Sequence, residues 1–424
     1  MQESSPKVIR FLRSYKTTLI LLIPVGLYYL RFIRRPGGMT DYPLGAECML
    51  KEQSLSVCSL GFTYPPVFYF LMIPFSFLPL WLRHVVWYVL SVSTLYYSFR
   101  LCEYLTRRTF AITFEGKELL WFRVLSFALS LKFILSVLEN QANDYLIFFF
   151  VLVGIYGLVE RKDICASFGI SVGAALKATP LIFFPYIVFK KRWKVVAGCM
   201  AFFIFFSFLP DVFFTPKDGE TGYFVSWVQG VVKPALSSTS SQAGFAFWEG
   251  ENVLNQSLRS FVYRIAVVSN LQAEHKKILF LVYGVFLSCV GFLLRTSSKV
   301  KDSFVLDGSV LLIAMLLLSP MSSKSHFVVL MLPYMVIVGY LMKQGSFRNV
   351  VGVLLAVSFA LNSLTSQDII GKKASLAMAY MGCITIGTTL LLIMLGIIIF
   401  AEVRGSMTKG SGVFDPQGPV GEIA

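Results

Sequence analysis

The chain is dominated by apolar segments long enough to cross a membrane, joined by short polar connections. Such segments recur from Thr17 to Phe400, and a helix needs about 20 apolar residues to span the hydrocarbon core. The pattern predicts an all-α polytopic membrane protein. We expect about twelve transmembrane helices of roughly that length, at residues 15–33, 84–104, 119–138, 144–160, 164–177, 179–189, 195–214, 277–295, 304–319, 326–342, 349–365 and 377–400.

Basic residues mark the ends of these segments. They cluster at positions 7–16, 100–117, 161–162, 190–194, 295–301, 343–348 and 404–409. Because cytoplasmic loops carry an excess of Lys and Arg, we place these clusters and both termini on the cytoplasmic side of a cell membrane, in bacteria the inner membrane. The net charge of +15 is therefore spread over many membrane boundaries, which argues against a nucleic-acid partner and for contact with membrane lipids.

The stretch 65–82 is apolar enough to span, but four prolines interrupt it. Counting it as a span would reverse the side of every later basic cluster, so we expect helices lying in the outer interface, with a kinked spanning helix as the alternative. The predicted catalytic domain is then residues 1–403, with a first outer loop at about 34–83 and a long outer loop at about 214–276. The Gly- and Ser-containing tail, 404–424, is expected to be disordered.

Cysteine usage adds one local expectation. Five of the seven cysteines lie in or beside apolar segments and are expected to be inert thiols: Cys102, Cys165, Cys199, Cys289 and Cys383. Cys48 and Cys58 share the first outer loop and could pair if that loop faces an oxidising compartment. Nothing else in the sequence demands this disulfide.

The predicted topology places most of the unusual polar residues on the outer face. They are Arg31, Arg34, Arg35, Asp41, Gln141, Asn143, Asp144, Lys177, Asn255, Gln256, Lys324 and His326. Charge at a membrane helix end on the side disfavoured for cations is costly and is usually functional. Lys177 follows an alanine-rich apolar run and has no obvious partner in lipid, so a phosphate would suit it. We therefore expect the active site on the outer face.

Asp41, in Met39-Thr40-Asp41-Tyr42 just beyond the first span, is the candidate general base. A carboxylate there can take a proton from a sugar hydroxyl. The alternatives are a helix cap or an ion pair with Arg34 or Arg35. No Asp-x-Asp motif occurs at this place, and the three histidines are too scattered for a metal site, so neither metal nor cofactor is expected.

Several short motifs occur in an order that resembles the GT-C glycosyltransferases of family 87, over roughly residues 15–345. The matching elements are Asp41-Tyr42, Phe62-Thr63-Tyr64-Pro65-Pro66, Gln141-Ala142-Asn143, Gly169 through Lys177-Ala178-Thr179-Pro180, Arg192-Trp193, Asn255-Gln256-Ser257-Leu258 and Ser319-Pro320. The sequence departs from the family after Ser319-Pro320, where Met321-Ser322-Ser323-Lys324-Ser325-His326 replaces a run that is often aromatic and histidine-rich.

The resemblance implies a GT-C-type bundle and a polyprenyl-phosphate-mannose-dependent mannosyltransferase. Such an enzyme moves a hexose, with inversion, from a polyprenyl-phosphate donor to a lipid or glycan acceptor on the outer face. Asp41 would then be the catalytic base. The expected donor-phosphate ligands are Lys177, Arg34, Arg35, Lys324 and His326, and the expected sugar or acceptor ligands are Tyr42, Tyr64, Gln141, Asn143, Asp144, Asn255 and Gln256.

Each of these roles has a simpler alternative. Arginines near a membrane snorkel to lipid headgroups, His326 could be a packing residue, and Asn143 or Asp144 could cap the helix that starts near Tyr145. A transporter or flippase of a lipid-linked sugar is the competing function. Transporters tend to show inverted repeats and broken helices at mid-membrane. We find no clear repeat, and only the break at Pro180 favours that function.

Overall fold

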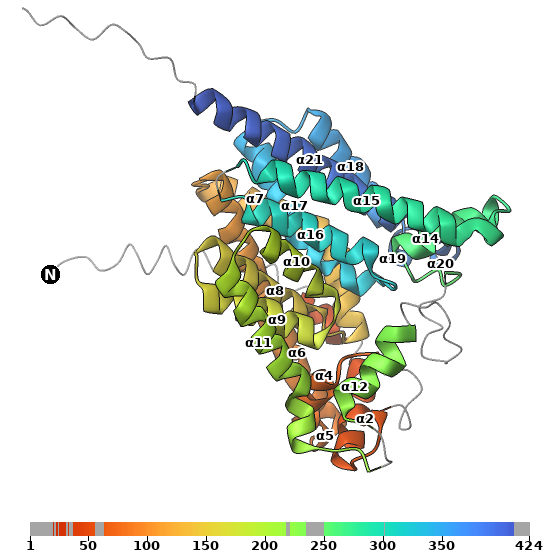
Figure 1. Ribbon diagram of the computed structural model, residues 1–424. Coiled ribbons are helices and arrows are strands. Elements are labelled where there is room, and N and C mark those ends of the chain that lie inside the picture. The colour runs from red at the N-terminus through yellow and green to blue at the C-terminus, as the bar shows by residue number, and fades with distance from the viewer. Residues whose placement is uncertain are drawn as a thin grey trace, which may run out of the picture.

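The protein is described here by a computed structural model, and its regular elements are helices throughout the described part of the chain (Figure 1). The described residues are 20, 23, 25–30, 33, 37–55, 63–217, 221–234, 250–300 and 302–410. Most of the first predicted span, together with Arg31, Arg34, Arg35 and Cys58, lies outside them.

The helices follow one another along the chain with short connections. Their bounds are α2 Gly38–Leu50, α4 Pro66–Leu71, α5 Ile73–Ser76, α6 Leu80–Phe110, α7 Gly116–Asn140, α8 Asp144–Val159, α9 Asp163–Leu176, η1 Thr179–Ile182, α10 Phe183–Phe189, α11 Trp193–Phe213, α12 Tyr223–Trp227, η2 Val228–Val232, α14 Leu258–Val268, η4 Gln272–Glu274, α15 His275–Ser297, α16 Phe304–Leu318, η5 Lys324–Leu330, α17 Met331–Lys343, α18 Val350–Ser363, α19 Gln367–Ile370, α20 Lys372–Tyr380 and α21 Cys383–Gly410.

Most predicted spans coincide with a helix to within a few residues, but the last one does not. The expected span 377–400 begins inside α20, and Gly382, with φ of +75°, separates α20 from α21. Glycine takes positive φ without steric cost, so it ends one helix and lets the next start in a new direction. Because α21 continues to Gly410, the expected tail cannot begin at Arg404.

The count of twelve transmembrane helices is not confirmed. Five helical segments of the described chain are long and apolar enough to cross a membrane: Gly116–Asn140, Trp193–Phe213, Gln272–Ser297, Lys324–Lys343 and Cys383–Gly405. Several others are apolar but shorter, such as α8 with 16 residues and α9 with 14 residues. Helix α6 has the length, but tyrosines, serines and charged residues lower its mean hydropathy.

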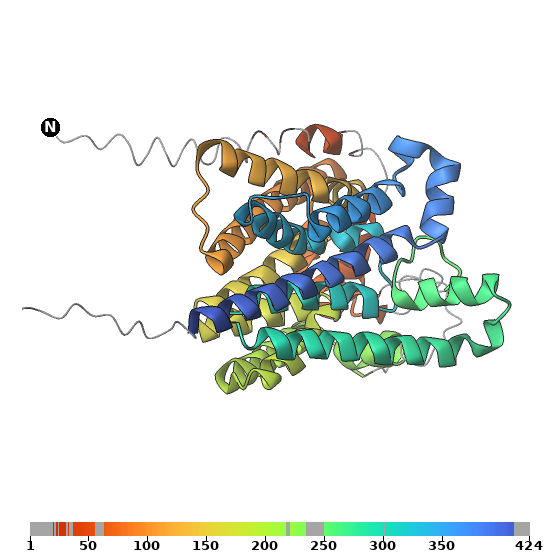
Figure 2. The ribbon, with the colours of Figure 1, turned by 90° about the horizontal axis from the view of Figure 1, so that it is seen from above.

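Helices α16 and α17 form the centre of the bundle (Figures 1 and 2). Nearly every side chain of both helices is buried. Helix α8 packs closely on α9 because small residues line their contact: a Cβ added at Gly157 would lie 2.3 Å from the backbone nitrogen of Ala166. Small residues at such contacts let membrane helices approach each other closely. This packing holds the helix ends in fixed relative positions.

The short helices after the first outer loop replace the predicted interfacial segment. Helices α4 and α5 have six and four residues, so neither can span a bilayer. Both pack against α2, and α4 also packs against α11. Cys48 on α2 is disulfide-bonded, and Cys58 lies outside the described residues.

The two ends of the bundle differ in chemistry. One end carries four ion pairs between the predicted basic clusters and nearby carboxylates: Arg108–Glu160, Arg192–Asp163, Lys190–Asp307 and Lys343–Glu402. The turn between α7 and α8, the end of α9 and the start of η5 lie at the opposite end. The fold therefore separates the basic clusters from most of the candidate site residues.

Candidate active site

The turn between α7 and α8 anchors the helix that carries Asp41. Gln141 ends α7 in the left-handed conformation, with φ of +50°. Its side-chain oxygen accepts a hydrogen bond from the backbone N–H of Met39 at 3.1 Å, and its carbonyl accepts one from the Trp87 indole at 2.9 Å. Gln141 thus fixes the first turn of α2, so Asp41 sits two residues beyond an anchored position.

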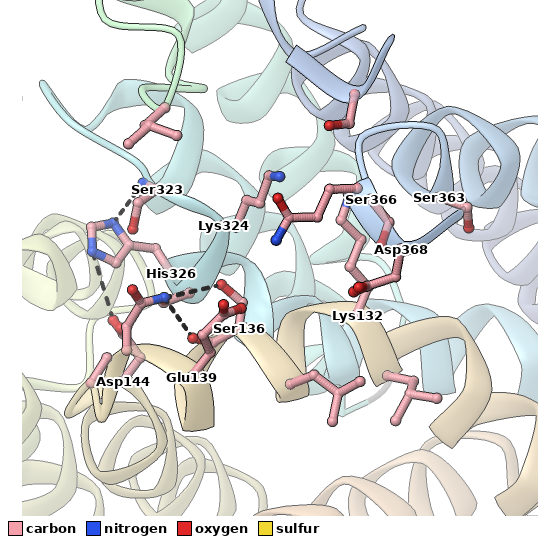
Figure 3. A pocket seen from close by; sticks show the side chains of 18 of the residues that line it. Lys132, Ser136, Glu139, Asp144, Ser323, Lys324, His326, Ser363, Ser366 and Asp368 are labelled. Carbon is pink, nitrogen blue, oxygen red and sulfur yellow. Dashed lines mark hydrogen bonds and ion pairs between the residues drawn. The ribbon is translucent and has the colours of Figure 1, made fainter. Parts of the chain in front are cut away.

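A cavity of about 730 Å³ opens beside this turn. Its walls come from α7, from the start of η5, and from the connection between α18 and α20, with Tyr42 and Tyr64 at another side (Figure 3). The ionisable residues of the lining, apart from these two tyrosines and Tyr28, are Lys132, Glu139, Asp144, Lys324, His326, Asp368 and Lys372. A concave site with a few convergent polar groups is the usual form of a small-molecule site.

Asp144 is the buried carboxylate of this cavity. Its Oδ1 lies 2.8 Å from the Lys177 ammonium and 4.0 Å from Nε2 of His326, a distance too long for a hydrogen bond. Its Oδ2 has no hydrogen-bond partner in the described chain. Asp144, Lys177 and His326 also line a second cavity of about 10 Å³, roughly the space of one water. Lys177 therefore has the protein partner that its sequence context did not reveal.

Two amides next to Asp144 keep buried polar atoms without partners. Both side-chain polar atoms of Asn143, and Nε2 of Gln141, make no hydrogen bond within the described residues. Asn143 occupies the N-cap position of α8 but forms no side-chain cap, so the capping alternative is wrong for this residue. Buried polar groups are rarely left unsatisfied. The turn therefore offers hydrogen-bonding capacity that the fold itself does not use.

Lys324 and His326 open the η5 helix on the other side of the cavity. Nδ1 of His326 accepts the backbone N–H of Ser323 at 3.3 Å and so helps to cap η5. The Lys324 ammonium donates to the carbonyl of Thr365 at 2.7 Å. His326 is therefore both a structural cap and a neighbour of Asp144.

Asp41 and the two candidate tyrosines occupy different surroundings. Tyr42 and Tyr64 line the cavity with their rings 5.6 Å apart, and burial raises the pKa of both phenols. Asp41 is exposed on α2, and the lining includes its neighbour Tyr42 but not Asp41 itself. Partial removal from water raises the pKa of Asp41 above its ordinary 3.8. Asp41 thus stands beside the cavity rather than within its wall.

Two of the expected sugar ligands serve the fold. Asn255 donates to the carbonyl of Pro320 at 3.0 Å, and its side-chain oxygen accepts the N–H groups of Ser257 and Ser322. Gln256 donates to the carbonyl of Ala379 at 2.8 Å. Neither residue lines the cavity. Their amides connect the long outer loop to the segment before η5 and to α20, which leaves little capacity for a sugar.

Lys132 is the cavity residue that sequence reasoning missed. It lies within α7, where its ammonium donates to the carbonyl of Asn362 and to Oγ1 of Thr365. A lysine inside an apolar helix is a functional candidate by default, so the signal was present in the sequence. It was overlooked because attention rested on the ends of the predicted spans.

The fold and the cavity define a helical membrane protein with a polar site at one end of its bundle. The model of glycosyltransferase family 87 matches residues 62–320, which is more than half of the chain. The chain belongs to glycosyltransferase family 87, as the motif order predicted, and is a membrane glycosyltransferase.

Two solved structures also align with the chain over most of its length. The structure of ArnT from Cupriavidus metallidurans bound to undecaprenyl phosphate has 11% sequence identity and a TM-score of 0.38, with 95% of this chain and 79% of that chain covered. The structure of ArnT in the apo state has 11% identity and a TM-score of 0.39, with 96% and 79% covered. No curated protein matches the sequence.

Proposed function

We propose that the protein transfers a hexose, with mannose the expected sugar, from a polyprenyl-phosphate donor to a lipid or glycan acceptor at the outer face of the membrane. The family membership supports glycosyl transfer. The observation that carries the proposal is the single cavity that combines lysines, carboxylates and unsatisfied amide groups at the end of an apolar bundle. A donor whose lipid chain stays in the membrane could present its head group there.

In the proposed reaction, Asp41 takes the proton of the acceptor hydroxyl. The acceptor oxygen forms a bond to the anomeric carbon while the bond from that carbon to the phosphate oxygen breaks. Polyprenyl phosphate leaves with the electron pair, and cationic side chains stabilise its charge. Inversion at a β-linked donor gives an α-linked product. No metal takes part in this scheme.

The anchored start of α2 supports Asp41 as the base. Gln141 fixes Met39, and Tyr42 lines the cavity, so the segment around Asp41 is held against the site. A raised pKa makes a carboxylate a stronger base than an ordinary aspartate while it remains ionised near neutral pH. Asp144 is the competing carboxylate, but its Oδ1 is paired with Lys177.

We assign the other expected residues according to their contacts. Lys324 is a donor-phosphate ligand, and Asn143, Gln141 and the free oxygen of Asp144 bind sugar or acceptor hydroxyls. Tyr42 and Tyr64 pack against the sugar from the other side of the cavity. We no longer propose Lys177 as a phosphate ligand, because its charge is already used to hold Asp144 in the ionised form.

The test is a transfer assay with purified protein in detergent. Polyprenyl-phosphate sugars are incubated with a lipid extract, and products that gain one hexose are sought by mass spectrometry. The proposal predicts a product with the mannose donor and none with nucleotide sugars. Movement of a labelled lipid-linked sugar across liposomes without any transfer product would instead indicate a flippase.

A further inference from the structure

Two lysines of the cavity meet at one residue of the loop that follows α18. Lys132 reaches this loop from α7, and Lys324 reaches it from η5 (Figure 3). Lys132 donates to the hydroxyl of Thr365 and to the carbonyl of Asn362, and Lys324 donates to the carbonyl of Thr365 at 2.7 Å. Two ammonium groups from separate helices are therefore gathered around Thr365.

This arrangement is costly without a further charge. Like charges held close together repel each other, and an apolar bundle screens that repulsion poorly. The hydrogen bonds of both ammonium groups go to neutral oxygens. Glu139 and Asp368 line the same cavity, but neither forms an ion pair with Lys132 or Lys324 in the described chain. The pair thus has uncompensated positive charge facing a polar cavity.

The donor count fits a phosphate. An ammonium group has three N–H donors. Lys132 uses two of them and Lys324 uses one in the bonds given above. Charge-assisted hydrogen bonds to phosphate oxygens are among the stronger polar contacts in proteins. The remaining donors of the two lysines can serve two or three phosphate oxygens.

We propose that Lys132 and Lys324 together bind the phosphate group of a lipid substrate. The inference rests on the proposed function and deepens it by naming a phosphate ligand inside α7. The phosphate could come from the polyprenyl-phosphate donor or from a phospholipid acceptor. Either lipid would have its sugar or headgroup in the same cavity as Asp144.

Binding of defined lipids to the purified full chain in detergent tests the proposal. The probes are undecaprenyl phosphate, undecaprenol as its phosphate-free partner, and phosphatidylinositol, each measured by native mass spectrometry. Lys132→Gln and Lys324→Gln should each weaken binding of one phosphorylated lipid about 10-fold or more, because each removes a charge-assisted contact. Neither should change binding of undecaprenol.

Matched variants separate a site from a general charge effect. Lys372→Gln removes the same charge from another part of the cavity wall and should change binding less than about 2-fold, since long-range surface charge is screened. Lys132→Arg retains the charge and should keep most of the affinity. If Lys132→Gln does not fold, Lys324→Gln and Lys132→Arg still test the pair.

The outcomes have different meanings. Loss of undecaprenyl phosphate binding assigns the pair to the donor, and selective loss of phosphatidylinositol binding assigns it to the acceptor. Unchanged binding of both lipids, or an equal loss in Lys372→Gln, overturns the pair as a phosphate site. The transfer assay is independent: transfer by the wild type with unchanged lipid binding in the variants would reject this inference and leave the proposed function standing.

Discussion

The ammonium of Lys177 lies 2.8 Å from Oδ1 of Asp144, and both side chains are largely buried. Lys177 ends α9 and Asp144 begins α8, so the pair joins two helices that already pack closely. The ion pair explains why a lysine is tolerated after an alanine-rich apolar run. It also keeps one carboxylate oxygen occupied and leaves the other facing the site.

This pair should behave as a coupled unit in stability measurements. Lys177→Met leaves Asp144 buried without its counter-charge and should lower the free energy of unfolding by about 3 kcal/mol. Asp144→Asn should also destabilise the protein, and the double variant should lose less than the sum of the two single effects. Unfolding in mixed micelles measures all four proteins. Strictly additive losses would show that the two groups do not depend on each other.

Asn143 should matter for activity but not for stability. Its buried amide makes no hydrogen bond, so Asn143→Ala should leave the unfolding temperature unchanged or slightly raised. The same change should weaken sugar transfer about 10-fold through an increased KM, because a ligand hydrogen bond is lost.

Asn255→Ala is the matched control for that prediction. The Asn255 amide holds Pro320, Ser257 and Ser322, so its removal should lower stability by about 1–3 kcal/mol. A stability loss in Asn143→Ala equal to that in Asn255→Ala would assign Asn143 to the fold rather than to the site.

The predicted sidedness can be tested by labelling in intact cells. Cysteine introduced at Thr40 or Gln367 should react with an impermeant maleimide added outside, whereas cysteine at Arg161 or Lys191 should react only after lysis. Gln367, Arg161 and Lys191 are exposed, and Thr40 is partly exposed. Labelling of Thr40 and Arg161 from the same side would contradict the topology and the outer active site.

The acid side of the pH–activity profile should report Asp41. A base works only when it is deprotonated, so transfer should be retained near neutral pH and lost as the pH falls through the pKa of Asp41. Because partial burial raises that pKa, the loss should begin above the range of an ordinary aspartate, whose pKa is 3.8. Initial rates between pH 4 and 8 measure this. A rate that stays constant down to pH 4 would contradict Asp41 as the base.

The sequence predicted the helices better than the site. Apolar runs and basic clusters located most helix bounds, since those depend on local composition. The partner of Lys177 and the bonds of Asn255 depend on contacts between distant segments, which a single sequence does not contain. Lys132 was visible as a charge within an apolar helix, but its meeting with Lys324 at Thr365 required the fold.

The most direct test of the account is the turnover of Asp41→Asn. Asparagine keeps the shape of the side chain but cannot take a proton near neutral pH. The account predicts transfer about 10²–10⁴-fold slower than wild type, with unchanged insertion and unfolding temperature. Glu47→Gln, which alters another carboxylate on α2, should leave turnover unchanged. Near-wild-type transfer by Asp41→Asn would contradict the assignment of Asp41 as the catalytic base.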